Sequence, residues 1–225
     1  MAMNNNPKRT FLLSIGALAL AAAICLGLSK NPPHILISNP PASSSPQSST
    51  LRVDKIIDGD TFILSDRRHV RLLGIDTPEV GEPYSDSAKI FADSVIADRQ
   101  IRLEFDKVIK DSYGRELAYL YIDSLCYNEL ILRRGFASIY LFKDNSRHAS
   151  KFIAAQNEAR TAKRGIWSLP PPQPEEYYIA AASSYRFHRP LCPSIKTINL
   201  KHARRFKTRD QALDSGLSPC RRCRP

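Results

Sequence analysis

Short apolar runs separated by turn residues begin at Leu51 and predict a strand-rich region. The first three runs read LRVDKII, TFIL and HVRLLGI, and we expect them to form a meander of three strands. QIRLEF at 100–105 alternates apolar and polar positions strictly, and ELAYLYI at 116–122 follows a YGR turn. These two runs predict a fourth and a fifth strand.

Apolar residues at helical spacing interrupt and follow these strands. One set recurs at positions 88, 91, 92, 95 and 96, and another at 149, 152 and 153, with Gln156 at the next helical position. A third, short helix is expected from Tyr127 to Arg134, because Gly135 follows it. Five strands with inserted and appended helices predict an α+β fold. The periodicity alone does not show whether the strands close into a barrel or protect their edges in another way.

The amino-terminal residues have the pattern of an export or anchor signal. Residues 11–28 carry no charge and follow Lys8 and Arg9, as a basic region precedes an apolar one in such signals. Length does not separate a cleaved signal from a membrane anchor. We expect the signal or anchor at 1–30 and a Pro/Ser-rich linker at 31–50. The protein would then be secreted, periplasmic or anchored to the outer face of the cytoplasmic membrane.

The formal charge is concentrated at the carboxyl end. The chain of 225 residues has a net charge of +11, and residues 178–225 hold eleven Lys and Arg against two Asp, a charge of +9. Such a basic tail attracts polyanions, above all nucleic acid. A merely soluble basic surface, or attraction to anionic lipid, stays open. The proline-rich residues 169–177 separate this tail from a domain at 51–168 and predict a stiff spacer.

Two turns carry closely spaced carboxylates. Asp58-Gly59-Asp60 follows the first expected strand, and Asp76-Thr77-Pro78-Glu79 follows the third. Phosphodiester hydrolysis needs an oxyphilic metal, a base or water-orienting group, and additional cations. Oxygen ligands suit calcium or magnesium. Taken singly, each motif is also an ordinary turn.

The order of the motifs is more specific than any one of them. VDKIIDGDT, VRLLGIDTPE, DSYGRELAYLY, RRGFASIYLFK and RGIWS together resemble the staphylococcal nuclease (thermonuclease) family, from about Val53 to Ser168. The resemblance implies a five-stranded OB-fold barrel with three helices and a calcium ion. It also implies endonuclease or exonuclease action on DNA, and often RNA, that leaves 3′-phosphate ends.

The same resemblance assigns roles to single residues. The calcium ligands would be the carboxylates of Asp60 and Asp76 and the backbone carbonyl of Thr77, with Asp58 in support. The residues that act on the substrate would be Glu79 as general base, Arg71 and Arg115 as transition-state cations, and Tyr113 and Tyr140 as nucleotide contacts.

Three positions depart from the family pattern. The loop VGEPYSDSAK after Glu79 lacks a lysine cluster, and Ser112 and Phe142 stand where a lysine and a tyrosine are expected. These departures concern substrate preference and affinity. They leave the expected metal ligands, base and arginines in place.

Residues 178–225 contain four soft potential ligands in two pairs. His188 and Cys192 form an H-x3-C pair, and Cys220 and Cys223 form a C-x2-C pair, a set suited to tetrahedral zinc. For an exported protein, a disulfide among the three cysteines is the alternative. Cys126 lies among apolar residues, so we expect it to be buried rather than reactive.

YRFHRPLC and RRFKTRDQALDSGLSPCRRCRP resemble the amino-terminal metal-binding domain of the Ada DNA-repair protein. In that domain four cysteines bind zinc, and the first also accepts methyl groups from DNA. His188 takes the first position here, which implies a structural zinc without the alkyl-accepting chemistry.

These observations predict a monomeric, calcium-dependent nuclease whose autonomous zinc domain tethers it to nucleic acid. Two alternatives remain. The barrel could bind nucleic acid without catalysis, or the protein could serve DNA uptake or surface binding, with cleavage incidental.

Overall fold

The computed structural model describes residues 51–197 and 199–225, which belong to one compact unit. The expected signal or anchor at 1–30, its apolar residues 11–28 and the linker at 31–50 lie outside the described residues. Within the described residues, no helix is long and apolar enough to cross a membrane.

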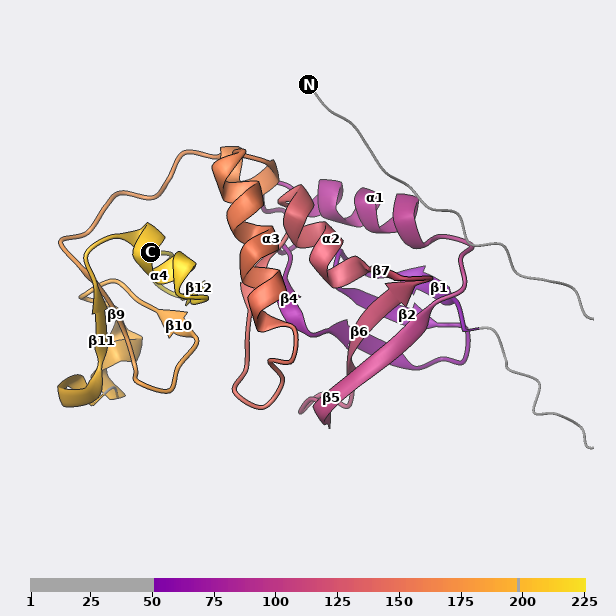
Figure 1. The fold of residues 1–225 in the computed structure, drawn as a ribbon, viewed down its shortest axis with the longest axis horizontal. Coiled ribbons are helices and arrows are strands. Elements are labelled where there is room, and N and C mark those ends of the chain that lie inside the picture. The colour runs from indigo at the N-terminus through magenta and orange to yellow at the C-terminus, as the bar shows by residue number, and fades with distance from the viewer. Residues whose placement is uncertain (1–50, 198) are drawn as a thin grey trace, which may run out of the picture. The chain divides into compact units, whose positions relative to one another are not determined.

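The first part of the fold is a sheet with the strand order β1-β2-β3-β6-β5 (Figure 1). Its strands are β1 (Val53–Ile56), β2 (Thr61–Leu64), β3 (His69–Leu72), β5 (Arg102–Lys110) and β6 (Glu116–Ile122), and the short β7 (Leu125–Cys126) pairs with β6. The β3 and β6 strands are parallel, and the other neighbours are antiparallel. A backbone hydrogen bond of 2.8 Å from Ile101 N to Leu51 O joins the two edges of the sheet. The five expected strands are therefore present.

The run HVRLLGI forms two strands instead of one. It breaks after β3, and β4 (Gly74–Asp76) pairs antiparallel with β8 (Ser138–Tyr140), so that Asp76 lies opposite Ser138. Gly74 has a φ of 76°, and a Cβ there would lie 2.7 Å from the ring of Phe152. Only glycine fits this bend, because the backbone is left-handed and the space is filled.

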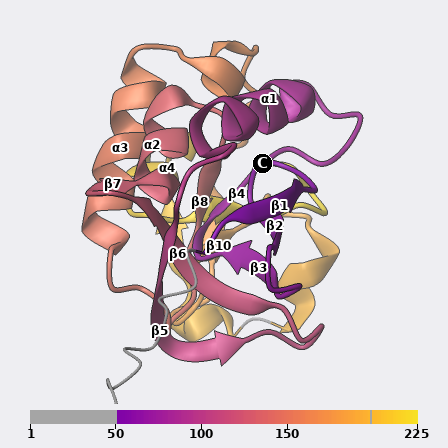
Figure 2. The same ribbon diagram turned by 90° about the vertical axis from the view of Figure 1, so that its right-hand side faces the viewer.

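Three helices lie side by side against this sheet (Figure 2). They are α1 (Ser85–Ile96), α2 (Tyr127–Arg134) and α3 (Ala149–Thr161), and the 3-10 helix η1 (Gly165–Ser168) follows α3. The apolar positions that predicted the helices face the core: Ala88, Ala92 and Phe152 are almost completely buried. The expected α+β class with three helices in this region is confirmed.

The C-terminal segment, residues 178–225, has a small core of its own. Its elements are β9 (Tyr178–Ala180), β10 (Arg186–Phe187), η2 (Pro193–Thr197), η3 (Leu200–His202), β11 (Arg204–Phe206), α4 (Arg209–Asp214) and β12 (Ser218–Pro219). The β9 strand pairs with β11, and β10 pairs with β12. The core consists of Tyr178, Ala180, Phe187, Ala212, Leu213 and Leu217, and Trp167 of η1 packs against it.

The C-terminal segment also packs directly on residues 51–168. Ser218 donates a buried hydrogen bond to the carbonyl of Ile139, and Arg160 of α3 pairs with Asp210 and Asp214. Tyr185 packs against the larger core. The C-terminal segment is therefore docked on residues 51–168 and is not attached through residues 169–177 alone. The hydroxyl of Ser218 and the apolar surface of the segment are covered by β8, by α3 and by the larger core. In a tail that did not dock, these groups would be exposed to water.

Candidate active site and metal centre

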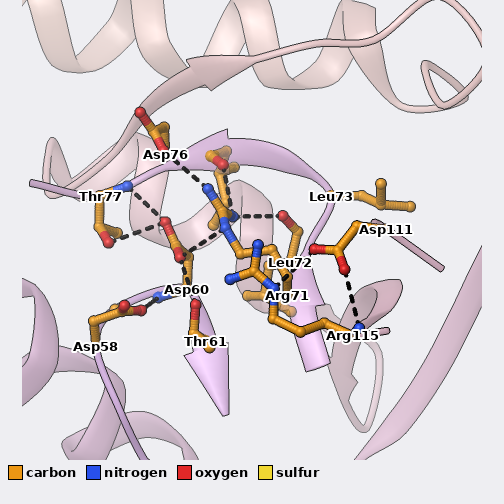
Figure 3. Close-up of polar contacts among 12 residues, drawn as sticks. Asp58, Asp60, Thr61, Arg71, Leu72, Leu73, Asp76, Thr77, Asp111 and Arg115 are labelled. Atoms are coloured by element: carbon orange, nitrogen blue, oxygen red, sulfur yellow. Dashed lines mark hydrogen bonds and ion pairs between the residues drawn. The ribbon is translucent and has the colours of Figure 1, made fainter. Parts of the chain in front are cut away.

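The two carboxylate-bearing turns meet, as the sequence predicted. The carboxylate of Asp60, just before β2, accepts hydrogen bonds from the backbone N–H of Thr77 at 2.7 Å and from its hydroxyl at 3.0 Å (Figure 3). Asp60 is 4% exposed. Because Thr77 follows β4, these bonds fix the first turn against the end of that strand.

Gly59 permits this close approach. A Cβ at Gly59 would lie 2.7 Å from Cγ2 of Thr77 and 2.9 Å from Cβ of Ala88 in α1. The carboxylate of Asp58 accepts a 3.0 Å hydrogen bond from the backbone N–H of Asp60, and Tyr127 donates one of 3.1 Å to the carbonyl of Gly59. The turn is therefore held from both sides.

Arg71 of β3 bridges the two turns and does not face solvent. Its Nε lies 3.1 Å from Oδ1 of Asp60, and its Nη2 lies 2.9 Å from Oδ1 of Asp76. Its Nη1 donates to the carbonyls of Leu72 and Ile75 at 2.8 and 2.9 Å. Three hydrogen bonds and the ion pair with Asp60 fix the plane of the guanidinium between the carboxylates.

The carboxylates are crowded enough to shift a protonation equilibrium. Burial raises the pKa of Asp60 from 3.8 to about 6; Arg71 opposes this rise, and the charges of Asp58 and Asp76 add to it. A cation bound beside Asp60 would favour its ionised form. This electrostatic environment is typical of a site that binds a cation.

A cavity of about 700 Å³ opens over these groups. All nine residues that the sequence assigned to the nuclease site line it: Asp58, Asp60, Arg71, Asp76, Thr77, Glu79, Tyr113, Arg115 and Tyr140. They come from five separate parts of the chain between β1 and β8. The expected site residues therefore share one cavity.

Arg115 has a partner that the sequence reasoning missed. Its Nε donates to Asp111 at 2.8 Å, and the same carboxylate accepts from the backbone N–H groups of Tyr113 and Arg115. Asp111 thereby orders the turn and aims Arg115. The signal was available, since Asp111 precedes Arg115 by four residues in the DSYGR turn.

Comparisons with known proteins agree with this geometry. A family model described as staphylococcal nuclease homologue matches residues 69–169. The thermonuclease of Staphylococcus hyicus is 33% identical over 134 residues, which cover 56% of this chain and 79% of that protein. The chain belongs to the staphylococcal nuclease family.

Other relatives are similar over the same region. The thermonuclease of Staphylococcus intermedius is 32% identical over 136 residues, covering 56% of this chain and 80% of that protein. The endonuclease YncB of Bacillus subtilis (strain 168) is 35% identical over 127 residues, covering 52% of this chain and 60% of that protein. The C-terminal segment lies beyond the residues that the family model matches.

One wall of the nuclease-family cavity nevertheless comes from the C-terminal segment. Arg221 lines the cavity and pairs with both Asp76 and Glu79. Sequence reasoning missed this residue, because an arginine between two cysteines of a C-x2-C pair carries no signal of a distant contact.

The four soft ligands in the C-terminal segment also converge. Ligand atoms of His188, Cys192, Cys220 and Cys223 all lie within 4.8 Å of one another, and the three thiols are free. His188 is 7% exposed, and its Nδ1 is buried without a hydrogen-bond partner among the described residues. A buried, unpartnered nitrogen costs free energy, so its place beside three thiols fits a metal ligand.

The protonation states of these groups also suit a metal. Burial, with the charge of Arg186, lowers the pKa of His188, so the imidazole is neutral as a ligand must be. Burial and the neighbouring thiols raise the pKa of Cys223 to about 12. A divalent cation would reverse this effect, because it stabilises thiolates.

Cys126 lies apart from this cluster. It is half-buried, and burial raises the pKa of its thiol. This environment agrees with the expectation of an unreactive cysteine.

Proposed function

We propose that this chain is a calcium-dependent nuclease that hydrolyses phosphodiester bonds of DNA, RNA or both and leaves 3′-phosphate ends. The observation that carries the proposal is the single cavity that gathers acidic, basic and aromatic side chains. Family membership supports the same reaction. Attack within the strand or at its ends is compatible with a cavity of this kind.

Calcium would bind to Asp60, Asp76 and the backbone carbonyl of Thr77. All three offer the oxygen ligands that calcium prefers, and a cation there would offset the burial that raises the pKa of Asp60. Asp58 supports the site through its bond to the backbone of Asp60. When bound, the ion supplies positive charge that neutralises the phosphate.

Glu79 is the proposed general base. Its side chain is 62% exposed at the edge of the cavity, so water reaches its carboxylate. Glu79 would accept a proton from the attacking water as the new oxygen–phosphorus bond forms. The bond from phosphorus to the 5′ oxygen then breaks, and the phosphate stays on the 3′ side.

The arginines would hold the phosphate oxygens. None of the described residues accepts a hydrogen bond from the terminal nitrogens of Arg115, so they can form a fork toward the phosphate. Arg71 commits most of its donors to protein oxygens. We therefore infer that Arg71 mainly orders the carboxylates and contributes its charge.

Tyr113 and Tyr140 are proposed to contact the nucleotide. Tyr113 is 84% exposed on the turn beside Arg115, where its ring is open to a base. Tyr140 ends β8, next to β4. Aromatic faces bind bases of any sequence, which agrees with a nuclease of low sequence preference.

We propose a structural zinc ion on His188, Cys192, Cys220 and Cys223. One imidazole and three thiolates whose ligand atoms lie within 4.8 Å of one another suit tetrahedral zinc. With the Ada-like motif around them, they would give the C-terminal segment a fixed, basic surface for nucleic acid.

Export is proposed from the sequence of residues 1–30, with membrane attachment through residues 11–28 if that segment is retained. A monomer is sufficient for the proposed chemistry, because one chain lines the whole cavity.

Hydrolysis assays test the proposal. The full chain is incubated with single-stranded DNA, duplex DNA or RNA, in calcium and then in excess chelator. Cleavage should require calcium, and Glu79→Gln should abolish most of it. Asp144→Asn is the control, since Asp144 also lines the cavity but has no proposed role. Full activity in the chelator, or in Glu79→Gln, would exclude this mechanism.

A further inference from the structure

The guanidinium of Arg221 occupies the position at which the proposed calcium and substrate would act. Its Nε lies 3.1 Å from Oδ2 of Asp76, its Nη2 bonds Oδ1 of Asp76, and its Nη1 bonds Oε1 of Glu79. The Arg221 side chain is 55% exposed, whereas that of Asp76 is 14% exposed. A half-exposed cation thus covers a largely buried carboxylate.

Arg221 is held in place by an ordered turn. The backbone N–H of Cys220 donates to the carbonyl of Phe187 at 3.0 Å, and that of Arg224 donates to the carbonyl of Cys220 at 2.8 Å. Two residues before Cys220, the buried hydroxyl of Ser218 bonds the carbonyl of Ile139. The backbone of this turn is therefore fixed next to β8, and the side chain of Arg221 extends from it to Asp76 and Glu79.

The contacts of Arg221 compete with calcium. Both carboxylate oxygens of Asp76 already receive guanidinium nitrogens, from Arg221 and, at Oδ1, also from Arg71. A calcium ion on Asp76 would lie against the charge of Arg221 and displace it. Three carboxylates, those of Asp60, Asp76 and Glu79, pair with the guanidinium groups of Arg71 and Arg221, so displacing Arg221 would leave negative charge that a divalent cation offsets.

Arg221 differs from Arg71 and Arg115 in the hydrogen-bond partners that it would lose when calcium and substrate bind. Arg71 keeps two backbone carbonyls and Arg115 keeps Asp111 when the site is loaded. The partners of Arg221 are the very groups that calcium and the attacking water would engage. Once released, the guanidinium of Arg221 would lie beside the cavity that receives the phosphate. Its Cζ atom is 5.9 Å from the ring centre of Tyr140.

We propose that Arg221 is a third arginine of the nuclease site, supplied by the C-terminal segment, that binds the substrate phosphate. Arg221 pairs with Asp76 and Glu79, and it would transfer to the phosphate if calcium bound Asp76. A guanidinium fork that fits a carboxylate also fits a phosphate. This inference rests on the proposed calcium-dependent nuclease.

The test compares Arg221→Gln with Arg222→Gln in the full chain. Arg222 is exposed, lies in the same turn and carries the same charge, so it controls for the loss of a positive charge. Calcium binding without substrate is measured by calorimetry, and KM and kcat are measured on a short oligonucleotide. Thermal unfolding shows whether the variants fold.

Arg221→Gln should bind calcium about threefold to tenfold more tightly, because a partly exposed competing ion pair is removed. Its KM should rise about tenfold, and Arg222→Gln should change neither value. If Arg221→Gln does not fold, Arg221→Lys carries the test, because an ammonium cannot reproduce the fork and KM should still rise.

Other outcomes separate the inference from the function on which it rests. Tighter calcium binding with unchanged or faster hydrolysis would show that Arg221 only blocks the site, and unchanged calcium affinity would show that it does not compete; either overturns the inference. A wild-type protein that neither binds calcium nor cleaves the oligonucleotide would instead overturn the proposed function.

Discussion

The hydroxyl of Ser218 donates a buried hydrogen bond to the backbone carbonyl of Ile139. Ile139 belongs to β8, and its neighbour Ser138 lies opposite Asp76 of β4. The C-terminal segment and the proposed calcium ligand are therefore attached to the same pair of strands.

Removing the hydroxyl of Ser218 should weaken the contact between the C-terminal segment and β8. Ser218→Ala leaves a buried carbonyl without its partner, so the free energy of unfolding should fall by about 1–3 kcal/mol. Urea unfolding measures this change. Ser215→Ala is the control, because the hydroxyl of Ser215 bonds only a carbonyl of its own helix on the surface. An equal fall in the free energy of unfolding of the two variants would mean that the hydrogen bond from Ser218 to Ile139 adds no stability.

The two arginines within the family match should respond differently to lysine. Arg115→Lys should lower kcat about a hundredfold, the usual effect of losing one transition-state donor, with little change in thermal stability. Arg71→Lys should lower both, because Arg71 also holds Asp60, Asp76 and two carbonyls. Arg67→Lys, at an exposed position, controls for the exchange itself. An unchanged kcat in Arg115→Lys would argue against its role.

Metal removal should affect both halves of the molecule. Native mass spectrometry should find one zinc per chain, lost in Cys220→Ser and retained in Cys126→Ser. The melting temperature should fall with the zinc, since so small a core depends on it. Calcium affinity should also change, because the turn that carries Arg221 loosens. A metal-free native protein with a disulfide between Cys220 and Cys223 would contradict this prediction.

Acid should destabilise the fold partly through Asp106. Burial alone would raise the pKa of Asp106, but hydrogen bonds from the backbone of Arg147 and the hydroxyl of Tyr119 lower it below its ordinary value of 3.8. The folded protein binds this proton less readily than the unfolded chain does. Its stabilising contribution is therefore present above pH 3.8 and is lost as the pH falls through the lowered pKa.

The measurement is the melting temperature as a function of pH. Asp106→Asn should be less stable than wild type near neutral pH, and the difference should shrink as the pH falls below about 4. Asp93→Asn, which alters an exposed carboxylate of α1, should show no such convergence. A constant difference at every pH would contradict the assignment.

The parts that the sequence predicted well depend on local patterns. The α2 helix runs from Tyr127 to Arg134 as expected. Its apolar residues mark the buried face, and Gly135 marks the end of the helix. The break between β3 and β4 was missed, although Gly74 was a signal. The strand β5 runs on to Lys110, five residues beyond the alternating pattern, because it stays paired with β6 after a bulge.

The proposed site residues, which line one cavity, were predicted through the order of motifs and not through any single one. Asp60 and Asp76 lie sixteen residues apart, and only pairing of strands brings them to Arg71. The docking of the C-terminal segment could not be predicted from the order of motifs. It depends on contacts such as Arg160 with Asp214 and Ser218 with Ile139, which join residues 54 and 79 positions apart.

Trp167 shows what this docking means for dissecting the protein. It lies two residues before the end of the region that the family model matches, yet it packs against the core of the C-terminal segment. Arg160, before that boundary, and Arg209, after it, both approach its ring. A chain truncated after Ser168 would keep every family motif but expose this indole to water and remove the Arg221 wall of the cavity. Truncation at the family boundary would thus produce an enzyme with a wider cavity opening and a newly exposed apolar patch, whereas a chain cut only between residues 169 and 177 would keep the segment docked through contacts such as that of Ser218 with Ile139.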